Sequence, residues 1–321
     1  MNALFPEIKP FDEQSLTVSA IHTLSIAQTG NPNGIPVVIL HGGPGGGRSP
    51  RLTQFFDPKH YRMVTFDQRG CGQSTPYGEL RDNNAQALID DIDTIRQFLG
   101  IDKWLVCGGS WGAQLGLRYG FRYAEHVVGF ILRSPFLGRR QDLQWRFAPH
   151  GGAAQIFPDH YAEFSERLER SDTLDPVLAY CNAFQHGSEF EQLAAAQQWS
   201  IWKGSLSHLV PPKVAKERFG LGKKSLALAR IESYFYKNKC FMPDNHIIDN
   251  IDKIKHLDCI LIHGRYDMVC KLEGSQMLAQ QWPNCQLQIV PGAGHSSSEI
   301  GVVDALIQGS NNMANWLSKR V

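Results

Sequence analysis

Ser110 has the surroundings of an enzymatic nucleophile. It lies in the turn GGSWG, after the apolar run Trp104–Cys107, which is typical of a buried strand, and before a segment with helical spacing. Such a strand–turn–helix unit strains the serine backbone, and Gly108 and Gly112 lack the Cβ atoms that would clash there. The turn lifts the hydroxyl above the sheet and aims the amide of Trp111 at the atom under attack. The sequence therefore predicts a nucleophile and half of an oxyanion hole in one turn.

Two further chemical groups follow strand-like segments near the end of the chain. Asp267 comes shortly after the apolar run Cys259–His263, and His295 ends the glycine-rich turn after Gln286–Val290. Loops that follow parallel strands share one edge of a sheet, so these side chains can meet Ser110 despite their separation in sequence. The order serine, aspartate, histidine is that of hydrolases with a nucleophile elbow. We predict a catalytic triad in which Asp267 orients His295 and His295 takes the proton of Ser110.

A glycine-rich loop follows an earlier buried strand. The apolar run Ile35–Leu40 ends in the residues HGGPGGG, which leave backbone N–H groups exposed beside the serine turn. The amide of Gly43 is predicted to complete the oxyanion hole together with that of Trp111. A phosphate-binding loop is the competing interpretation, but the Lys-Ser/Thr pair that ends a P-loop is missing. His41 stands at the strand end, and we interpret it as a structural hydrogen-bonding residue rather than a base.

The charged pair Asp67 and Arg69 lies in another glycine-rich turn, after the strand-like run Tyr61–Phe66. These side chains could bind substrate. An unpaired charge is costly to bury, so such a pair more often orders its own loop. We therefore favour a structural role for both residues.

The other segments predict a fold that positions these groups. The segment Ser15–Gln28 alternates polar and apolar residues like a hairpin at a sheet edge. Ala87–Leu99 has the apolar spacing of an amphipathic helix that stops at Gly100, and Val127–Leu132 reads as a further strand. Strand and helix thus alternate. The pattern predicts the α/β class, with a mostly parallel sheet covered by helices on both faces.

This alternation stops in the middle of the chain. Residues 139–245 are rich in aromatic residues, Gln, Ala and Glu, and their apolar spacing is helical where it is regular. We expect an inserted helical cap over the carboxyl ends of the strands, between two parts of the core, residues 1–138 and 246–321. Within it, Trp199 and Trp202 stand at i, i+3 on one helix face, where they either pack in the cap or contact substrate.

Composition narrows the choice of partner and compartment. The formal net charge is +1 and no long run of Lys or Arg occurs, so nucleic acid and an anionic membrane are not expected partners, whereas a small peptide or acyl-amide substrate is. The seven cysteines are scattered without a CxxC pair, which argues against disulfides and a zinc site. The first residues contain acidic side chains and no continuous apolar stretch, so we expect a cytoplasmic protein.

The motifs HGGPGGG, DQRGCGQS, GGSWG, HGRYD and PGAGH, in this order and at these spacings, resemble the prolyl iminopeptidase branch of the α/β-hydrolase superfamily. The resemblance covers nearly the whole chain. It implies an α/β-hydrolase fold with a cap and an enzyme that releases N-terminal proline from peptides. No metal or organic cofactor is expected. Carried over position by position, it implies a triad and two oxyanion donors, namely Ser110, Asp267, His295, Gly43 and Trp111.

The resemblance also points to the substrate-binding residues. The family holds the free amine of the proline with two acidic residues of the cap, and Glu232 matches the second of them. The first, after Trp202, is Lys203 in this chain. Two like charges 4 Å apart repel by about 4 kcal/mol at an effective dielectric near 20. Lys203 therefore either faces inward and repels the amine, pairs with Glu232, or turns outward and leaves the amine to Glu232.

Three functional hypotheses follow. The first is a serine aminopeptidase that releases N-terminal proline through an acyl-enzyme, with Glu232, Lys203 and Trp202 in its substrate pocket. The second is a related amidase or esterase that acts on acyl substrates without a free amine, because Lys203 alters that pocket. The third is a catalytically silent fold used for binding, which the intact triad argues against.

Overall fold

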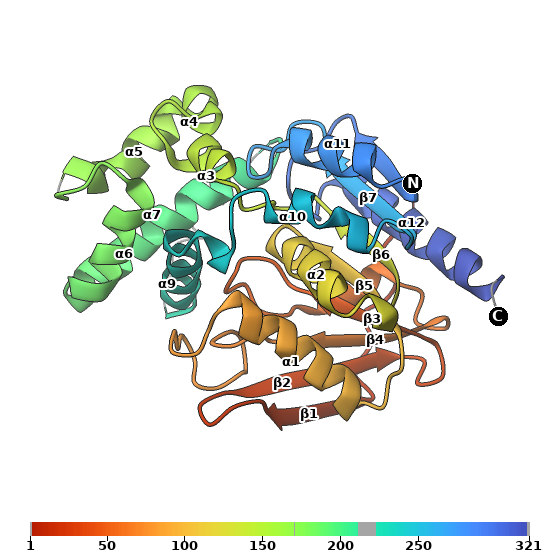
Figure 1. Cartoon of the computed structure of the whole chain (residues 1–321). Helices are drawn as coiled ribbons and strands as arrows, with labels where there is room; N and C mark the ends of the chain where they lie inside the picture. Colours follow the sequence, from red (N-terminus) through yellow and green to blue (C-terminus); the bar gives the residue numbers. More distant parts are fainter. Residues whose placement is uncertain (1, 170, 211–222, 320–321) are drawn as a thin grey trace.

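The computed structural model describes residues 2–169, 171–210 and 223–319. Its strands are β1 (Asp12–Thr17), β2 (Thr23–Gly30), β3 (Ile35–Leu40), β4 (Tyr61–Phe66), β5 (Trp104–Gly109), β6 (Val127–Arg133), β7 (Cys259–Gly264) and β8 (Cys285–Val290). They form one eight-stranded sheet in the order β1-β2-β4-β3-β5-β6-β7-β8 (Figure 1). Strand β2 pairs antiparallel with β1 and β4, and the pairs from β4 to β8 are parallel. The predicted edge hairpin and mostly parallel sheet are confirmed.

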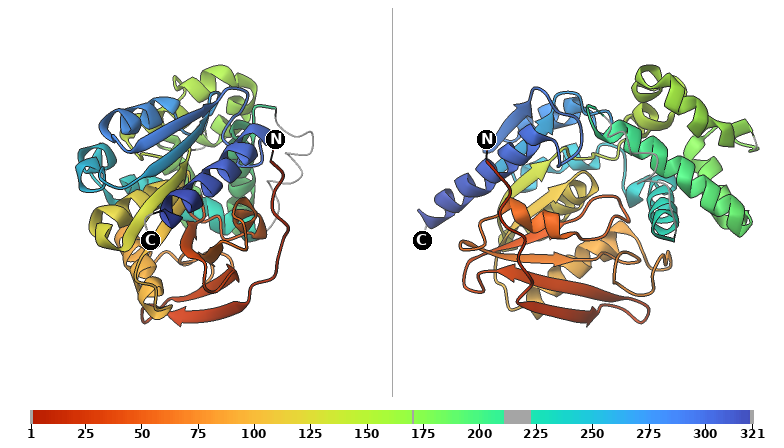
Figure 2. Two further views of the ribbon diagram at one scale, coloured as in Figure 1. Left: turned by 90° about the vertical axis from the view of Figure 1, so that its right-hand side faces the viewer. Right: turned by 180° about the vertical axis from the view of Figure 1, so that it is seen from behind.

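Helices cover both faces of this sheet. Those of the core are α1 (Ala85–Phe98), α2 (Trp111–Arg122), α11 (Leu272–Gln281) and α12 (Ile300–Ser318). Successive residues of a strand point to opposite faces, so Val38 packs in the cluster that contains α1, α2 and α11, while Val37 packs in the cluster that contains α12. In the view from behind, α12 crosses in front of the strands (Figure 2). The fold is the expected α/β-hydrolase architecture.

The chain between β6 and β7 is helical. Its elements are α3 (Arg140–Phe147), α4 (Gly152–Ile156), α5 (Pro158–Glu169), α6 (Pro176–His186), α7 (Glu189–Ser207), α9 (Lys223–Lys237) and α10 (His246–Asp249). The helices α3 to α7 and α9 stand together beside the sheet (Figure 1). Short 3-10 helices are η1 (Pro50–Phe55), η2 (Ala124–His126), η3 (Lys239–Phe241) and η4 (Ile251–Lys253).

These helices contact the loops that follow the parallel strands. After β3, the Tyr236 hydroxyl of α9 lies 3.3 Å from the carbonyl oxygen of Gly43. After β8, the amide of Ser296 donates to the carbonyl oxygen of Ser207 in α7, at 2.7 Å. The helical segment therefore covers the carboxyl ends of the strands, the edge at which the predicted site residues lie. The exact division into residues 1–138, 139–245 and 246–321 stays a prediction.

An aromatic cluster forms the interior of the helical segment. Phe164 stacks on Tyr180 and on Trp202, with ring centroids 4.8 Å and 5.4 Å apart, and Phe147 stacks on Trp199 at 5.0 Å. Such pairs add to the free energy of burial. Among the described residues, no helix is both long and apolar enough to span a bilayer.

Candidate active site

Ser110 occupies a strained turn between β5 and α2. Its backbone has φ 57° and ψ −119°, outside the regions that side-chain-bearing residues prefer. The turn tolerates no bulk nearby: a Cβ on Gly108 would lie 2.4 Å from the carbonyl oxygen of Gly112, and one on Gly112 would lie 2.1 Å from that of Leu40. The predicted strand–turn–helix unit and the steric reason for its glycines are confirmed.

Asp267 and His295 are in contact across two neighbouring loops. The Nδ1–H of His295 donates to Oδ2 of Asp267 at 2.8 Å. The other carboxylate oxygen accepts the amides of Val269 and Cys270, at 2.9 Å and 2.8 Å. The two loops approach closely at Gly264, at the end of β7. A Cβ there would lie 2.1 Å from the carbonyl oxygen of Gly294, so the position leaves no room for a side chain. Asp267 therefore fixes both the ring and the tautomer of His295 and leaves Nε2 free to accept a proton.

Burial sets the resting charge of this pair. It lowers the pKa of His295 to about 4, against the opposing pull of Asp267, and the cation Arg133 adds to the lowering. Burial opposes ionisation of Asp267, but the charge of His295 and its hydrogen bond outweigh it and hold the pKa of Asp267 below its usual value. At neutral pH the imidazole is uncharged beside an ionised carboxylate, the state that a general base requires.

The serine and the histidine share a common neighbour. The amide of Ser110 donates to the carbonyl oxygen of Arg133 at 2.9 Å, and the guanidinium of Arg133 donates to the carbonyl oxygen of His295. The Ser110 hydroxyl lies 3.8 Å from the Cys270 sulfur. Within the described residues, no hydrogen bond joins the hydroxyl to His295, as is common in enzymes without substrate.

The predicted oxyanion donors are two backbone amides in the serine turn and in the loop beside it. Trp111 is the first residue of α2, so its amide has no acceptor within the helix. The loop after β3 passes close by, since a Cβ on Gly42 would lie 3.8 Å from the Cβ of Ser110. The next residue, Gly43, has φ +129°, a conformation that glycine adopts readily and that residues with a side chain rarely adopt. In the described part of the chain, the amides of Gly43 and Trp111 donate no hydrogen bond.

His41 and Gln68 hold this loop against the serine turn. The Gln68 amide donates to Nε2 of His41 at 3.0 Å, and Nδ1 lies 2.9 Å from the Gly42 carbonyl oxygen and 3.2 Å from the Gly47 amide nitrogen. Gln68 also bridges to the neighbouring turn, because its side chain accepts the Trp111 indole N–H at 2.9 Å. The geometry matches the structural role expected for His41. Sequence reasoning missed Gln68, whose only signal is its place in the DQRGCGQS motif.

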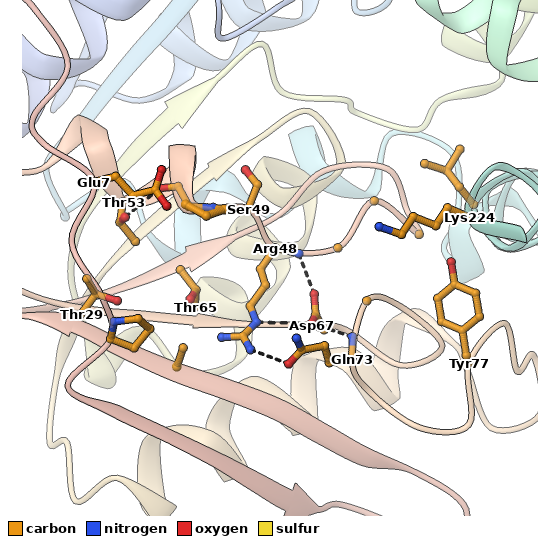
Figure 3. A pocket seen from close by; sticks show the side chains of 18 of the residues that line it. Glu7, Thr29, Arg48, Ser49, Thr53, Thr65, Asp67, Gln73, Tyr77 and Lys224 are labelled. Atoms are coloured by element: carbon orange, nitrogen blue, oxygen red, sulfur yellow. Dashed lines mark hydrogen bonds and ion pairs between the residues drawn. The ribbon is translucent and has the colours of Figure 1, made fainter. Parts of the chain in front are cut away.

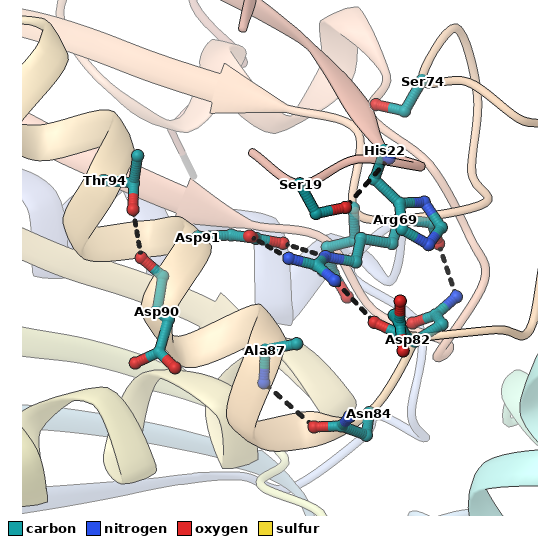
Figure 4. Close-up of polar contacts among 12 residues, drawn as sticks. Ser19, His22, Arg69, Ser74, Asp82, Asn84, Ala87, Asp90, Asp91 and Thr94 are labelled. Atoms are coloured by element: carbon teal, nitrogen blue, oxygen red, sulfur yellow. Dashed lines mark hydrogen bonds and ion pairs between the residues drawn. The ribbon is translucent and has the colours of Figure 1, made fainter. Parts of the chain in front are cut away.

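Asp67 and Arg69 do not pair with each other. Arg69 forms a two-pronged ion pair with Asp91 of α1, with both distances 2.7 Å (Figure 4). Asp67 accepts the amides of Arg48 and Gln73 at 2.6 Å and 2.9 Å, and the guanidinium of Arg48 lies against it (Figure 3). Both charges order their own loops, as the structural interpretation predicts.

Lys203 pairs with Glu232, which decides between the three predicted orientations. Its Nζ lies 2.8 Å from Oε1 of Glu232, a side chain with no solvent exposure. Glu232 also accepts the Trp199 indole N–H and the Tyr236 hydroxyl, each at 2.8 Å, and lies 3.5 Å from Arg146. Burial opposes its ionisation, but the charges of Lys203 and Arg146 outweigh it and lower its pKa. Burial lowers the pKa of Lys203 too.

Arg146 and Tyr236 also belong to this cluster, and sequence reasoning missed both of them. Arg146 is 2% exposed and donates to the Tyr236 hydroxyl at 3.0 Å. Trp202 lies in the aromatic cluster of the cap, 1% exposed, and its indole N–H donates to the Arg146 carbonyl oxygen at 3.2 Å. Trp202 therefore touches the charged cluster through the backbone of Arg146.

A cavity of about 1130 Å³ opens beside this cluster, with Lys203 in its lining. Figure 3 shows part of the lining, including Lys224. The N-terminal segment, the glycine loop after β3 and the helices α7 and α9 line it. Lys203 and Lys224 border it from the cap, and Gly45–Gly47 border it from the core. Ser110 and His295 lie outside its described lining. The cavity therefore reaches the charged cluster and the loop of Gly43 rather than the serine itself.

Known proteins resemble this chain over nearly its full length. A family model described as the alpha/beta hydrolase fold matches residues 35–302. A probable proline iminopeptidase of Leptolyngbya boryana is 40% identical over 97% of both chains, and a proline iminopeptidase of Arabidopsis thaliana is 41% identical over 97% of this chain and 82% of its own.

Solved structures share the fold at lower identity. A proline iminopeptidase of Mycobacterium smegmatis superposes with a TM-score of 0.59 at 19% identity, covering 96% of this chain and 98% of its own. An esterase of Exiguobacterium antarcticum superposes with a TM-score of 0.63 at 16% identity, covering 92% of this chain and 96% of its own. These show the fold alone, whereas the curated relatives show the family. The chain is an enzyme of the proline iminopeptidase family, within the α/β-hydrolase fold.

Proposed function

We propose that this enzyme is a serine hydrolase in which Ser110, His295 and Asp267 form a catalytic triad. The observation that carries the proposal is the 2.8 Å contact of His295 Nδ1 with Asp267, on loops at the same sheet edge as the strained turn of Ser110. A neutral, oriented imidazole beside a serine on a nucleophile elbow is the arrangement of a base and its nucleophile.

The reaction follows from these positions. Nε2 of His295 takes the hydroxyl proton as Ser110 attacks the carbonyl carbon, and the amides of Gly43 and Trp111 hold the resulting oxyanion. His295 returns the proton to the leaving amine, so the amide bond breaks and an acyl-enzyme remains. Water, deprotonated by the same histidine, then attacks the ester, releases the acid and restores the hydroxyl of Ser110. This sequence uses no metal or organic cofactor.

The first candidate substrate is a small peptide with N-terminal proline. It is the activity named for the curated relatives, which are about 40% identical to this chain. Glu232 would hold the free amine in that case. Trp202 would support the pocket indirectly, through its hydrogen bond to the backbone of Arg146.

The second candidate is an amide or ester whose acyl group has no free amine. The ion pair of Glu232 with Lys203 favours it, because a carboxylate already matched by a lysine at 2.8 Å has less attraction left for a substrate ammonium. The catalytic steps at Ser110 are the same for both candidates.

Steady-state hydrolysis of p-nitroanilides tests the proposal. L-Proline, L-alanine, N-acetyl-proline and pentanoic acid p-nitroanilides are compared on the wild type and on Ser110→Ala and His295→Ala. We expect cleavage that disappears in both variants, with proline preferred for the first candidate and blocked or simple acyl groups for the second. Cleavage by Ser110→Ala at the wild-type rate would overturn the triad.

We also propose the cytoplasm as the compartment. All seven cysteines are free, and six of them are buried, as is typical of proteins in reducing surroundings. Free thiols are counted in protein from cell extracts before and after oxidation with diamide. We expect seven free thiols before oxidation.

A further inference from the structure

The cluster around Glu232 contains more positive than negative charge. The guanidinium of Arg146 and the ammonium of Lys203 share the single carboxylate of Glu232. The Tyr236 hydroxyl contributes no anion, because burial raises its pKa well above the usual value. In the described residues, the cluster thus keeps one unit of positive charge that no protein carboxylate neutralises. Buried charges of this kind are costly unless an opposite charge meets them.

Both cations retain unused donors. The buried Nε of Arg146 has no hydrogen-bond partner among the described residues. Lys203 Nζ can donate three hydrogen bonds. Within the described part of the chain it donates one, to Glu232. Its side chain is 25% exposed and borders the cavity of about 1130 Å³. A ligand in that cavity can therefore contact the Lys203 side chain.

The cluster lies near the proposed oxyanion hole. The Tyr236 hydroxyl, 2.8 Å from Glu232, also lies 3.3 Å from the carbonyl oxygen of Gly43, whose amide is the proposed oxyanion donor. A group held by the cluster would thus lie close to the loop that carries the proposed oxyanion donor Gly43.

We propose that Lys203, supported by Arg146, binds a carboxylate on the acyl part of the substrate. This inference rests on the proposed attack by Ser110 and names the substrate class of the second candidate, amides whose acyl group bears a negative charge instead of a free amine. The carboxylate would neutralise the excess charge of the cluster and accept the unused donors of Lys203. An N-terminal ammonium would meet the same excess charge and be repelled.

Binding to the Ser110→Ala enzyme tests the site without turnover. Isothermal titration compares the mono-anilide of glutaric acid, which carries a carboxylate, with the anilide of L-proline, which carries an ammonium. We expect the glutaric compound to bind at least tenfold more tightly. Adding Lys203→Met should weaken its binding tenfold or more, the range for a hydrogen bond to a charged group. Lys203→Gln serves as a second neutral variant if Lys203→Met fails to fold.

Lys224→Met is the matched control. Lys224 borders the same cavity but is exposed, so its loss should change the affinity for the glutaric compound less than threefold. Lys203→Glu, which reverses the charge, should invert the preference towards the proline anilide. Tighter binding of the proline anilide to Ser110→Ala, or an equal loss of affinity in Lys224→Met and Lys203→Met, would overturn the inference.

Turnover separates this inference from the proposed function. With Ser110 intact, the p-nitroanilides of glutaric acid, pentanoic acid and L-proline are compared. Serine-dependent cleavage without preference for the glutaric compound would refute the carboxylate site and leave the triad standing. Selective binding of the glutaric compound with equal cleavage by wild type and Ser110→Ala would uphold the carboxylate site and refute the triad.

Discussion

Lys203 and Glu232 form an ion pair at 2.8 Å, with the carboxylate wholly shielded from solvent. This contact joins α7 to α9 and places a cation where the resemblance to the family leads one to expect an acid. The cap position after Trp202 therefore carries a positive charge, which shares Glu232 with Arg146, instead of a negative charge that would attract an ammonium.

Glu232→Gln should destabilise the fold. It leaves Lys203 and Arg146 close together without their shared carboxylate, and removing one partner of a buried ion pair costs about 3–5 kcal/mol. Urea denaturation measures the change. Asp252→Asn is the control, because Asp252 pairs with Lys255 on the surface, where such pairs contribute about 0–1 kcal/mol. Equal losses of unfolding free energy in the two variants would show that the buried ion pairs of Glu232 stabilise the fold no more than a surface ion pair does.

Gly112→Ala should disrupt the serine turn. The new Cβ would lie 2.1 Å from the backbone oxygen of Leu40, which cannot move without shifting β3, so we expect a loss of about 3 kcal/mol or more. Gly292→Ala is the comparison, since a Cβ there meets nothing within 4 Å. Thermal unfolding of both variants measures the difference. Similar melting temperatures would contradict the close approach of strand and helix.

The acid limb of the pH profile should lie near 4. His295 must be neutral to act as a base, and burial, helped by the charge of Arg133, lowers its pKa from 6.5 to about 4 against the opposing charge of Asp267. The value of kcat/KM for a neutral anilide should stay level from pH 7 to about pH 5 and fall as the pH drops through 4. An acid limb centred on 6.5 would show an imidazole in water rather than one buried beside Arg133.

The same shift has a consequence for stability. The unfolded chain binds a proton at His295 below pH 6.5, whereas the folded chain resists it down to about pH 4. The contribution of His295 to stability is therefore present above pH 6.5 and is lost as the pH falls. Circular dichroism at each pH separates loss of fold from loss of the base.

Local sequence patterns predicted the parts of the site that local geometry builds. The turn of Ser110 and the loops of Asp267 and His295 follow from apolar runs that end in glycine, because a strand and the turn after it are set by neighbouring residues. The orientation of Lys203 could not be predicted, since its partner Glu232 lies on another helix. Arg146 was missed for the same reason: 86 residues separate it from Glu232, and no motif links them.

The triad should behave as a unit. Ser110→Ala, His295→Ala and the double variant should each lower kcat by about four orders of magnitude or more, with little further loss on combining them. Initial rates on the preferred anilide measure this. Losses that multiply in the double variant would indicate that the two side chains act independently.

Covalent labelling of Ser110 tests the central claim most directly. The wild type is treated with a fluorophosphonate, digested and analysed by mass spectrometry, in parallel with His295→Ala. We predict stoichiometric modification of Ser110 in the wild type and labelling slowed by at least a hundredfold in His295→Ala. An unmodified Ser110 in folded wild-type protein, or equal labelling rates in the two proteins, would contradict a serine activated by His295.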